Sequence, residues 1–216
     1  MKRACDEKKF VGEFADEFCD VEGLMEMNLP DPTLLEFYRR VQKREILWND
    51  DIDDSTIDIA LYIKKWNEED KGKLAEERKP IKIFINSDGG SLDTVMHIID
   101  MILLSRTPVI TIGMGRVYSA GGLLLMAGHK RYIFNHTSCL IHDGSSGAIG
   151  NIGKLLDNLK FTEALERRIK QYITTRTHIT SEMYDENYRR DWFLFSDEMI
   201  QLGIADEIVT DIDTIL

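Results

Sequence analysis

The sequence predicts an α/β fold, because two apolar strands are each followed by a glycine-containing turn and then by a helix. The first of these units covers residues 81–104 and the second covers residues 109–129. In each unit a β-branched run precedes the glycines, and apolar residues at helical spacing follow them. Strands joined in this way lie parallel, so both turns are expected at the same edge of the sheet. With 216 residues, the chain suits one domain with a sizeable core.

The first thirty residues are acidic and contain little glycine, and Pro30 and Pro32 then interrupt the chain. Two interpretations of this segment stay open, a short amphipathic helix and a mobile leader. The helix would carry apolar side chains at near-helical spacing, namely Phe10, Val11, Phe14 and Phe18. We therefore assign residues 1–32 to an N-terminal extension and residues 33–216 to the main domain.

Before the paired units, the sequence predicts a helix over residues 33–44, a strand over 45–48 and a helix over 55–69. The second helix has an apolar face, and the turn before it is rich in residues that cap helices. The charged stretch 68–79 is expected to be a solvated loop or a helix end.

Within the first unit, the β-branched run at 81–85 predicts a strand, which the polar segment 86–90 ends. The helix at 92–103 has apolar residues at helical spacing and ends before Pro108. The second unit begins with a strand at 109–112.

The C-terminal part of the chain is predicted to contain both strands and helices. The predictions rest on short β-rich runs and on apolar residues at helical spacing. Strands are expected at 131–134, 138–142 and 204–209. Helices are expected at 152–177, at 181–188 and in a final segment that Ser196 caps and Gly203 ends.

Composition predicts a globular protein without nucleic-acid or membrane partners. Hydrophobic residues make up 43% and charged residues 30% of the chain. The net charge of −11 argues against nucleic acid and anionic membranes, because both need clustered Lys and Arg. No secretory signal or membrane-length apolar run is expected. The cysteines, Cys5, Cys19 and Cys139, fit neither a disulfide framework nor a zinc site, so a reducing cytoplasm is the expected compartment.

Ser119 lies in the turn of the second unit, within the glycine-rich stretch 113–122. Glycines in this stretch allow the backbone to turn sharply. The start of the following helix has unpaired N–H groups and a partial positive charge, which stabilise nearby negative charge. Ser119 is therefore either an N-cap or a nucleophile. The G-x-S-x-G motif of lipases and esterases is absent, because Val117 occupies the position of its first glycine.

Two further residues could complete a nucleophilic site. His142 ends a predicted strand and enters a glycine-containing loop, where functional side chains are often found. Asp191 precedes the apolar run 192–195, so we expect it to be partly buried and to need a partner. That partner is either a neighbouring arginine, Arg189 or Arg190, or a histidine ring. The remaining histidines are interpreted as structural or exposed: His97, His129, His136 and His178.

The chain resembles the proteolytic subunits of Clp (caseinolytic) proteases, the ClpP family, over about residues 33–210. The resemblance rests on the order and spacing of the matching segments 84–90, 113–121, 140–142, 190–194 and 196–206. It implies a ClpP/crotonase-like spiral of β-β-α units with a long protruding helix, the handle. Such subunits form heptameric rings, and two rings stack into a tetradecamer that encloses the active sites.

The resemblance implies a serine endopeptidase. Ser119 would be the nucleophile, His142 the general base and then acid, and Asp191 the group that orients the imidazole. The backbone N–H groups of Gly90 and Ala120 would form the oxyanion hole. Substrate contacts would come from Gly89, Ser91, Leu92, Asp143 and Gly144. No metal and no cofactor is expected.

The resemblance also implies the partners. Peptides or unfolded proteins would be the substrates, and a separate AAA+ unfoldase of the ClpX, ClpA or ClpC type would deliver them in protein quality control. The sequence has no Walker A motif, so the chain itself is not expected to hydrolyse ATP. The N-terminal end of such subunits lines the axial pore and meets the ATPase. Residues 1–32 are therefore expected to face the pore or the partner, or to be mobile.

The chain departs from the family pattern in two places. Asp88 stands where the family usually has proline, and a carboxylate there could alter the loop or recruit a cation. Residues 143–147 replace the usual Gln-Pro-Leu-Gly-Gly, which begins the strand that binds substrate and joins rings. Two alternatives therefore stay open: a non-catalytic ClpP-like scaffold or regulatory subunit in a mixed ring, and an acyl-CoA enzyme of the crotonase type.

Overall fold

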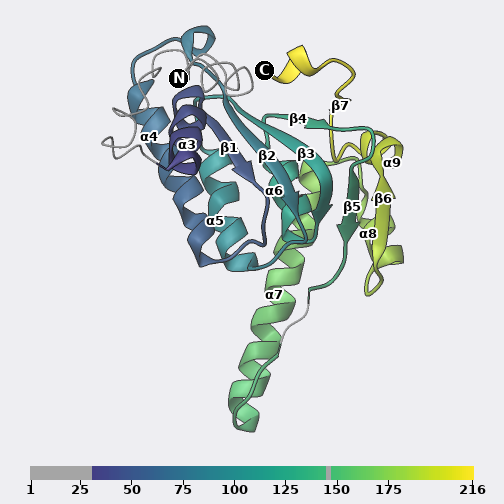
Figure 1. Ribbon diagram of the computed structural model, residues 1–216. Helices are drawn as coiled ribbons and strands as arrows, with labels where there is room; N and C mark the ends of the chain where they lie inside the picture. The colour runs from purple at the N-terminus through teal and green to yellow at the C-terminus, as the bar shows by residue number, and fades with distance from the viewer. Residues whose placement is uncertain (1–30, 145–146) are drawn as a thin grey trace, which may run out of the picture. The chain divides into compact units, whose positions relative to one another are not determined.

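The computed structural model describes residues 31–144 and 147–216 (Figure 1). The described chain divides into two units, with the boundary between Arg40 and Val41. The described part of the first unit lies in α3 (Pro32–Lys43), where the Phe37 and Tyr38 rings meet edge to face at 5.9 Å. The amphipathic helix considered for Phe10 to Phe18 lies outside the described residues.

Seven strands form one sheet in the described part of the chain, which confirms the predicted α/β class. The main path runs in the order β1-β2-β3-β4-β7, and all of its pairs are parallel. β5 pairs with β3 in parallel and with β6 antiparallel. The strands are β1 (Glu45–Trp48), β2 (Ile81–Ser87), β3 (Val109–Tyr118), β4 (Lys130–Ile133), β5 (Ser138–Ile141), β6 (Trp192–Phe195) and β7 (Glu207–Ile208).

Helices cover the sheet and enclose the core. α4 packs against α5, α5 packs against α6, and α6 contacts β2 and β3. Large apolar side chains at these contacts, such as Trp66, Ile83, Ile99 and Leu124, are almost fully buried. The helices are α4 (Asp58–Glu69), α5 (Leu92–Leu103), α6 (Ala120–Ala127), α7 (Ile152–Arg176), α8 (Ser181–Asn187) and α9 (Ser196–Gln201), with short 3-10 turns at Asp54–Ile57, Ala75–Glu77 and Ile212–Ile215.

β3 is longer than the sequence predicts. The prediction of a strand over 109–112 followed by a turn from Gly113 is wrong. β3 continues through Gly113 and Gly115 to Tyr118. Its first half pairs with β4 and its second half with β5. Gly115 has φ +69°, and the side-chain oxygen of Asn86 occupies the space that a Cβ would need. The glycine thus fits an irregularity in the β2–β3 pairing, and the chain turns only at Ser119.

α7 is the predicted long helix, and it extends beyond the sheet as a handle (Figure 1). The Asn151 side chain caps it by accepting a hydrogen bond from the Lys154 N–H at 3.1 Å. Its apolar stripe begins with Leu155 and Leu159, which are exposed, and Ile173 near its end is buried in the core.

The last strand is shorter than the predicted 204–209, because only Glu207 and Ile208 pair with β4. The backbone N–H groups of Ile204 and Ala205 instead donate to the Met199 carbonyl at the end of α9. The positive φ of Gly203 allows the chain to fold back in this way.

The charged stretch 68–79 is not wholly solvated, because the Asp70 side chain is 0% exposed. Both nitrogens of the Arg44 fork donate to its carboxylate, at 2.6 and 3.0 Å. Thr107 and Lys73 add hydrogen bonds at 2.9 and 2.8 Å. Asp70 therefore joins β1, the end of α4 and the start of β3 through one buried ion pair.

Candidate active site

Ser119 occupies the junction between β3 and α6 with φ +52° and ψ −121°, a conformation that a residue with a side chain rarely adopts. Its N–H donates to the Leu140 carbonyl at 2.8 Å, and its carbonyl accepts from Gly122 at 3.0 Å. It lies at the N-cap position, but its hydroxyl forms no capping hydrogen bond within the described residues. The simple N-cap interpretation therefore does not explain the hydroxyl.

The glycine turn after β2 lies directly beside Ser119, as the parallel arrangement predicts. A Cβ added at Gly89 would be 2.7 Å from the Ser119 Cβ. On the other side, the Ile52 N–H donates to the Gly89 carbonyl at 2.7 Å, and the Ser91 N–H donates to the Ile52 carbonyl at 2.6 Å. The turn is thus fixed between Ile52 and Ser119.

The close approach at Gly90 gives a testable prediction. Gly90 has φ +137°, and a Cβ there would lie 2.2 Å from the Ile52 carbonyl oxygen. We expect Gly90→Ala to lower the free energy of unfolding by about 2–4 kcal/mol, through backbone strain and overpacking. Urea denaturation measures the change.

Gly72→Ala is the matched control, because Gly72 has φ +89° but nothing within 4 Å of an added Cβ. This variant isolates the backbone strain, about 1–2 kcal/mol. Equal losses in the two variants would contradict the role assigned to the Ile52 contact.

His142 and Asp191 face each other at the end of an antiparallel pair. Ile141, the last residue of β5, pairs with Trp192, the first residue of β6. His142 follows β5 and Asp191 precedes β6, so these two residues extend the same antiparallel pair. His142 Nδ1 lies 3.7 Å from Asp191 Oδ1, a distance that permits an ion pair but is longer than a hydrogen bond.

The expectation that Asp191 is partly buried is wrong, because its side chain is 66% exposed, against 25% for His142. The apolar run that follows forms β6, and Asp191 lies just outside its first residue. The Arg189 guanidinium lies over the Tyr188 ring, 5.2 Å from its centre. Of the partners considered for Asp191, the histidine ring is the one within ion-pair distance.

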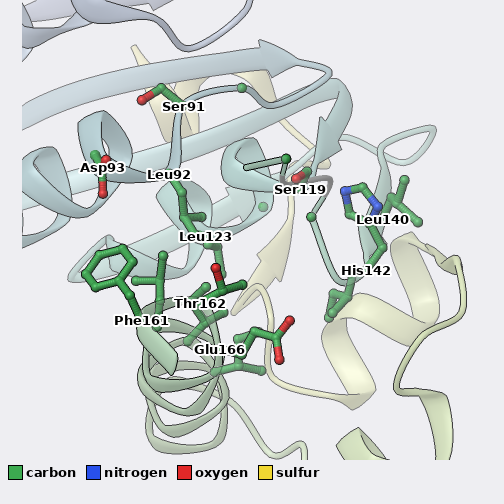
Figure 2. A pocket seen from close by; sticks show the side chains of 18 of the residues that line it. Ser91, Leu92, Asp93, Ser119, Leu123, Leu140, His142, Phe161, Thr162 and Glu166 are labelled. Carbon is green, nitrogen blue, oxygen red and sulfur yellow. The ribbon is translucent and has the colours of Figure 1, made fainter. Parts of the chain in front are cut away.

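A cavity of about 830 Å³ is lined by six of the ten predicted site residues (Figure 2). Ser119 and His142 line it at the sheet edge, and α6 and α7 form its apolar walls. Of the other predicted site residues, Gly90, Ser91, Leu92 and Gly144 also line this cavity.

Four predicted site residues are not among those that line this cavity: Gly89, Ala120, Asp143 and Asp191. Asp143 lines a second, small hollow together with His142, Tyr184 and Trp192. Ala120 is buried as the first residue of α6, where its N–H has no carbonyl of its own helix to bind.

Both departures from the family pattern can be located. The Asp88 carboxylate pairs with Arg116 Nη1 at 2.9 Å, so it recruits a cation from β3. In the second departure, residues 143–144 and 147 belong to neither a helix nor a strand, and Ser145 and Ser146 lie outside the described residues.

Sequence reasoning missed the α7 wall of the cavity. Leu159, Thr162, Glu166 and Ile169 line it and are spaced three or four residues apart, so they share one helix face. Figure 2 shows Thr162 and Glu166 on the opposite side of the cavity from Ser119 and His142. A carboxylate that interrupts an apolar stripe was the signal available in the sequence.

Two groups near the site, one buried and one half-buried, stay uncharged at neutral pH. The Cys139 side chain is fully buried, and this burial raises the pKa of its thiol to about 12. Burial, together with neighbouring carboxylates, also raises the pKa of Tyr184 to about 12. In the described part of the chain, no three His, Cys, Asp or Glu side chains gather in a way that could hold a metal ion.

The fold and the cavity define an α/β protein whose polar side chains gather beyond the carboxyl ends of parallel strands. The family model described as Clp protease matches residues 36–211, so the chain belongs to the Clp protease family. Its fold is therefore that of ClpP, and the family assigns it to the peptidases.

Proteins similar to this chain include the ATP-dependent Clp protease proteolytic subunit 2 of Bifidobacterium longum, 30% identical over 82% of this chain and 85% of that protein. The protein of the same name from Tropheryma whipplei is 29% identical over 81% of this chain and 96% of its own length. Within residues 31–144 and 147–216, none of the helices combines the length and apolar character needed to cross a membrane.

Proposed function

We propose that the protein is a serine endopeptidase, the proteolytic subunit of a Clp-type ring protease, with Ser119, His142 and Asp191 as its catalytic triad. The observation that carries this proposal is the cavity that Ser119 and His142 line together, with Asp191 3.7 Å behind the imidazole. The strained backbone of Ser119 supports it further, because strain of this kind is concentrated at functional sites.

In the proposed mechanism, His142 Nε2 accepts the Ser119 hydroxyl proton while the serine oxygen attacks the peptide carbonyl. The N–H groups of Gly90 and Ala120 donate to the resulting oxyanion. His142 then gives the proton to the leaving amine as the C–N bond breaks, which leaves an acyl-enzyme on Ser119. A water molecule next attacks the acyl carbon while His142 accepts its proton, and His142 returns that proton to the Ser119 oxygen as the ester bond breaks. Asp191 holds the imidazole through Nδ1 and stabilises its charged form.

The remaining parts of the proposal follow the family. The peptidase domain spans 33–216 and includes the family match at 36–211. Gly89, Ser91, Leu92, Asp143 and Gly144 contact substrate. Subunits assemble into stacked heptameric rings, and an AAA+ unfoldase delivers unfolded proteins in the cytoplasm.

Hydrolysis of an internally quenched peptide by the purified, assembled protein tests the proposal. We expect peptide cleavage that needs no ATP, with no turnover of CoA thioesters. Turnover of a CoA thioester without peptide cleavage would favour the crotonase-type alternative. An assembled ring that cleaves neither substrate, alone or with a Clp ATPase, would favour a non-catalytic subunit.

A further inference from the structure

Glu166 places a carboxylate on the α7 wall of the cavity, where most of the other lining side chains are apolar. Leu159, Leu165 and Ile169 of α7 surround it on this wall, and Leu123 and Met126 of α6 lie across from them. The side chain is partly buried, unlike most charged residues on the exposed part of the helix. A carboxylate in such surroundings loses hydration, and a partner must replace that hydration.

One partner of Glu166 is already present. The Tyr188 hydroxyl donates to Glu166 Oε2 at 2.7 Å and fixes the carboxylate against the end of α8. The hydroxyl is neutral, and no Lys or Arg of the described residues forms an ion pair with Glu166 directly; the Arg189 guanidinium instead lies over the Tyr188 ring. Oε1 has no hydrogen-bond partner recorded among the described residues, and Figure 2 shows the carboxylate on the cavity side of α7.

The other charges around the cavity do not neutralise Glu166. Among the described residues that line it, the charged side chains are Asp88, Asp93, Glu166 and, when protonated, His142. Arg116 pairs with Asp88 outside the lining, and Asp93 is exposed at the first turn of α5. The cavity therefore combines long apolar walls with excess negative charge.

A lysine or arginine side chain matches both properties of this cavity. Its methylene stem packs on apolar surface while its charged head reaches a carboxylate. The substrate side chain next to the scissile carbonyl is the one closest to Ser119, so it is the one that can enter. We propose that Glu166 is a specificity-determining residue that selects Lys or Arg at this position. The proposal rests on the proposed peptidase function of the same cavity.

Two peptides that differ by one ammonium group test the proposal. One has lysine before the scissile bond and the other has norleucine, which keeps the aliphatic stem without the charge. We expect kcat/KM to favour lysine by about tenfold, the effect of one charge-assisted hydrogen bond. In Glu166→Gln the preference for lysine should disappear. The amide oxygen still accepts the hydrogen bond from the Tyr188 hydroxyl, but the side chain carries no charge.

Glu163→Gln is the matched control, since Glu163 is exposed on α7 and is not among the residues that line the cavity. It removes the same charge from the same helix and should keep the lysine preference. A wild-type protein that cleaves both peptides equally, or a Glu166→Gln variant that keeps the preference, would overturn the proposal.

Binding separates this proposal from the proposed function. Fluorescence anisotropy on the Ser119→Ala background measures the affinity for both peptides without cleavage. We expect the lysine peptide to bind about tenfold more tightly, and Glu166→Gln to remove the difference. A preference in binding without any peptidase activity would reject the peptidase function and keep the recognition by Glu166. Cleavage of both peptides without a preference would support the peptidase function and reject the recognition of Lys or Arg by Glu166.

Discussion

Replacement of His142 by alanine is expected to lower kcat for peptide hydrolysis by about 10⁴-fold or more. The Ser119 hydroxyl is a weak nucleophile, and His142 is the base with which it shares the cavity. Without the imidazole, the proton of the hydroxyl has no acceptor and the leaving amine has no donor. Steady-state hydrolysis of a fluorogenic peptide measures the loss.

The double variant Ser119→Ala, His142→Ala sharpens this prediction. Groups that act as one unit are not additive, so the double variant should be no slower than either single variant. His136→Ala is the control, because His136 is exposed and is not among the residues that line the cavity. A His142→Ala variant that keeps wild-type kcat would contradict the proposed mechanism.

Asp70→Asn is expected to cause the largest loss of stability, about 3–5 kcal/mol. The Asp70 side chain is fully buried and the Arg44 side chain is 8% exposed, so the variant leaves a buried guanidinium without its main counter-charge. The Asn side chain has nearly the same size, so packing changes little. Urea denaturation at pH 7 measures the loss.

The same pair gives a pH dependence. Hydrogen bonds from Arg44 hold the pKa of Asp70 well below its usual value, although burial opposes this, and Lys73 and Thr107 add to the effect. In the unfolded chain the carboxyl titrates near pH about 3.9. The stabilisation is therefore complete above that pH and is lost as the pH falls toward the folded-state pKa.

The stability difference between the wild type and Asp70→Asn should consequently shrink below about pH 4. Glu68→Gln is the control two residues earlier in the chain, because Glu68 forms an exposed ion pair with Lys64 and should change stability little. A difference between wild type and Asp70→Asn that stays constant from pH 7 to pH 3 would contradict the assigned role of the ion pair.

The sequence predicted the layers of the fold well, because they depend on local patterns. The β-branched runs at β2 and β3 are followed by apolar helices, and such units lie parallel for general steric reasons. This pattern alone predicts the turn at Gly89 beside Ser119, where the structure has it. The long helix α7 was equally clear from its apolar spacing.

The predictions from the sequence are wrong where the conformation or burial of a residue depends on a partner far away along the chain. The glycines at 113–115 predict a turn, but Gly115 is a glycine because the Asn86 side chain lies against it. The stretch 68–79 is predicted to be a solvated loop or a helix end, and α4 does end there at Glu69, but Asp70 is buried because Arg44, 26 residues earlier, reaches it. Neither partner can be identified from the local pattern.

In the candidate site, too, local patterns identify residues but not the contacts that those residues make. His142 and Asp191 were singled out from their places beside apolar runs, but their pairing depends on the register of β5 with β6. The exposure of Asp191 depends on where β6 begins. Glu166 was missed because a helix stripe does not show which of its faces borders a cavity.

Labelling of the assembled protein with a fluorophosphonate probe, read by intact mass, tests the central claim most directly, because only an activated serine reacts. The proposed triad predicts one probe per chain in the wild type and none in Ser119→Ala. A wild-type ring that does not react, or a Ser119→Ala variant that reacts equally, would contradict the assignment of Ser119 as the nucleophile.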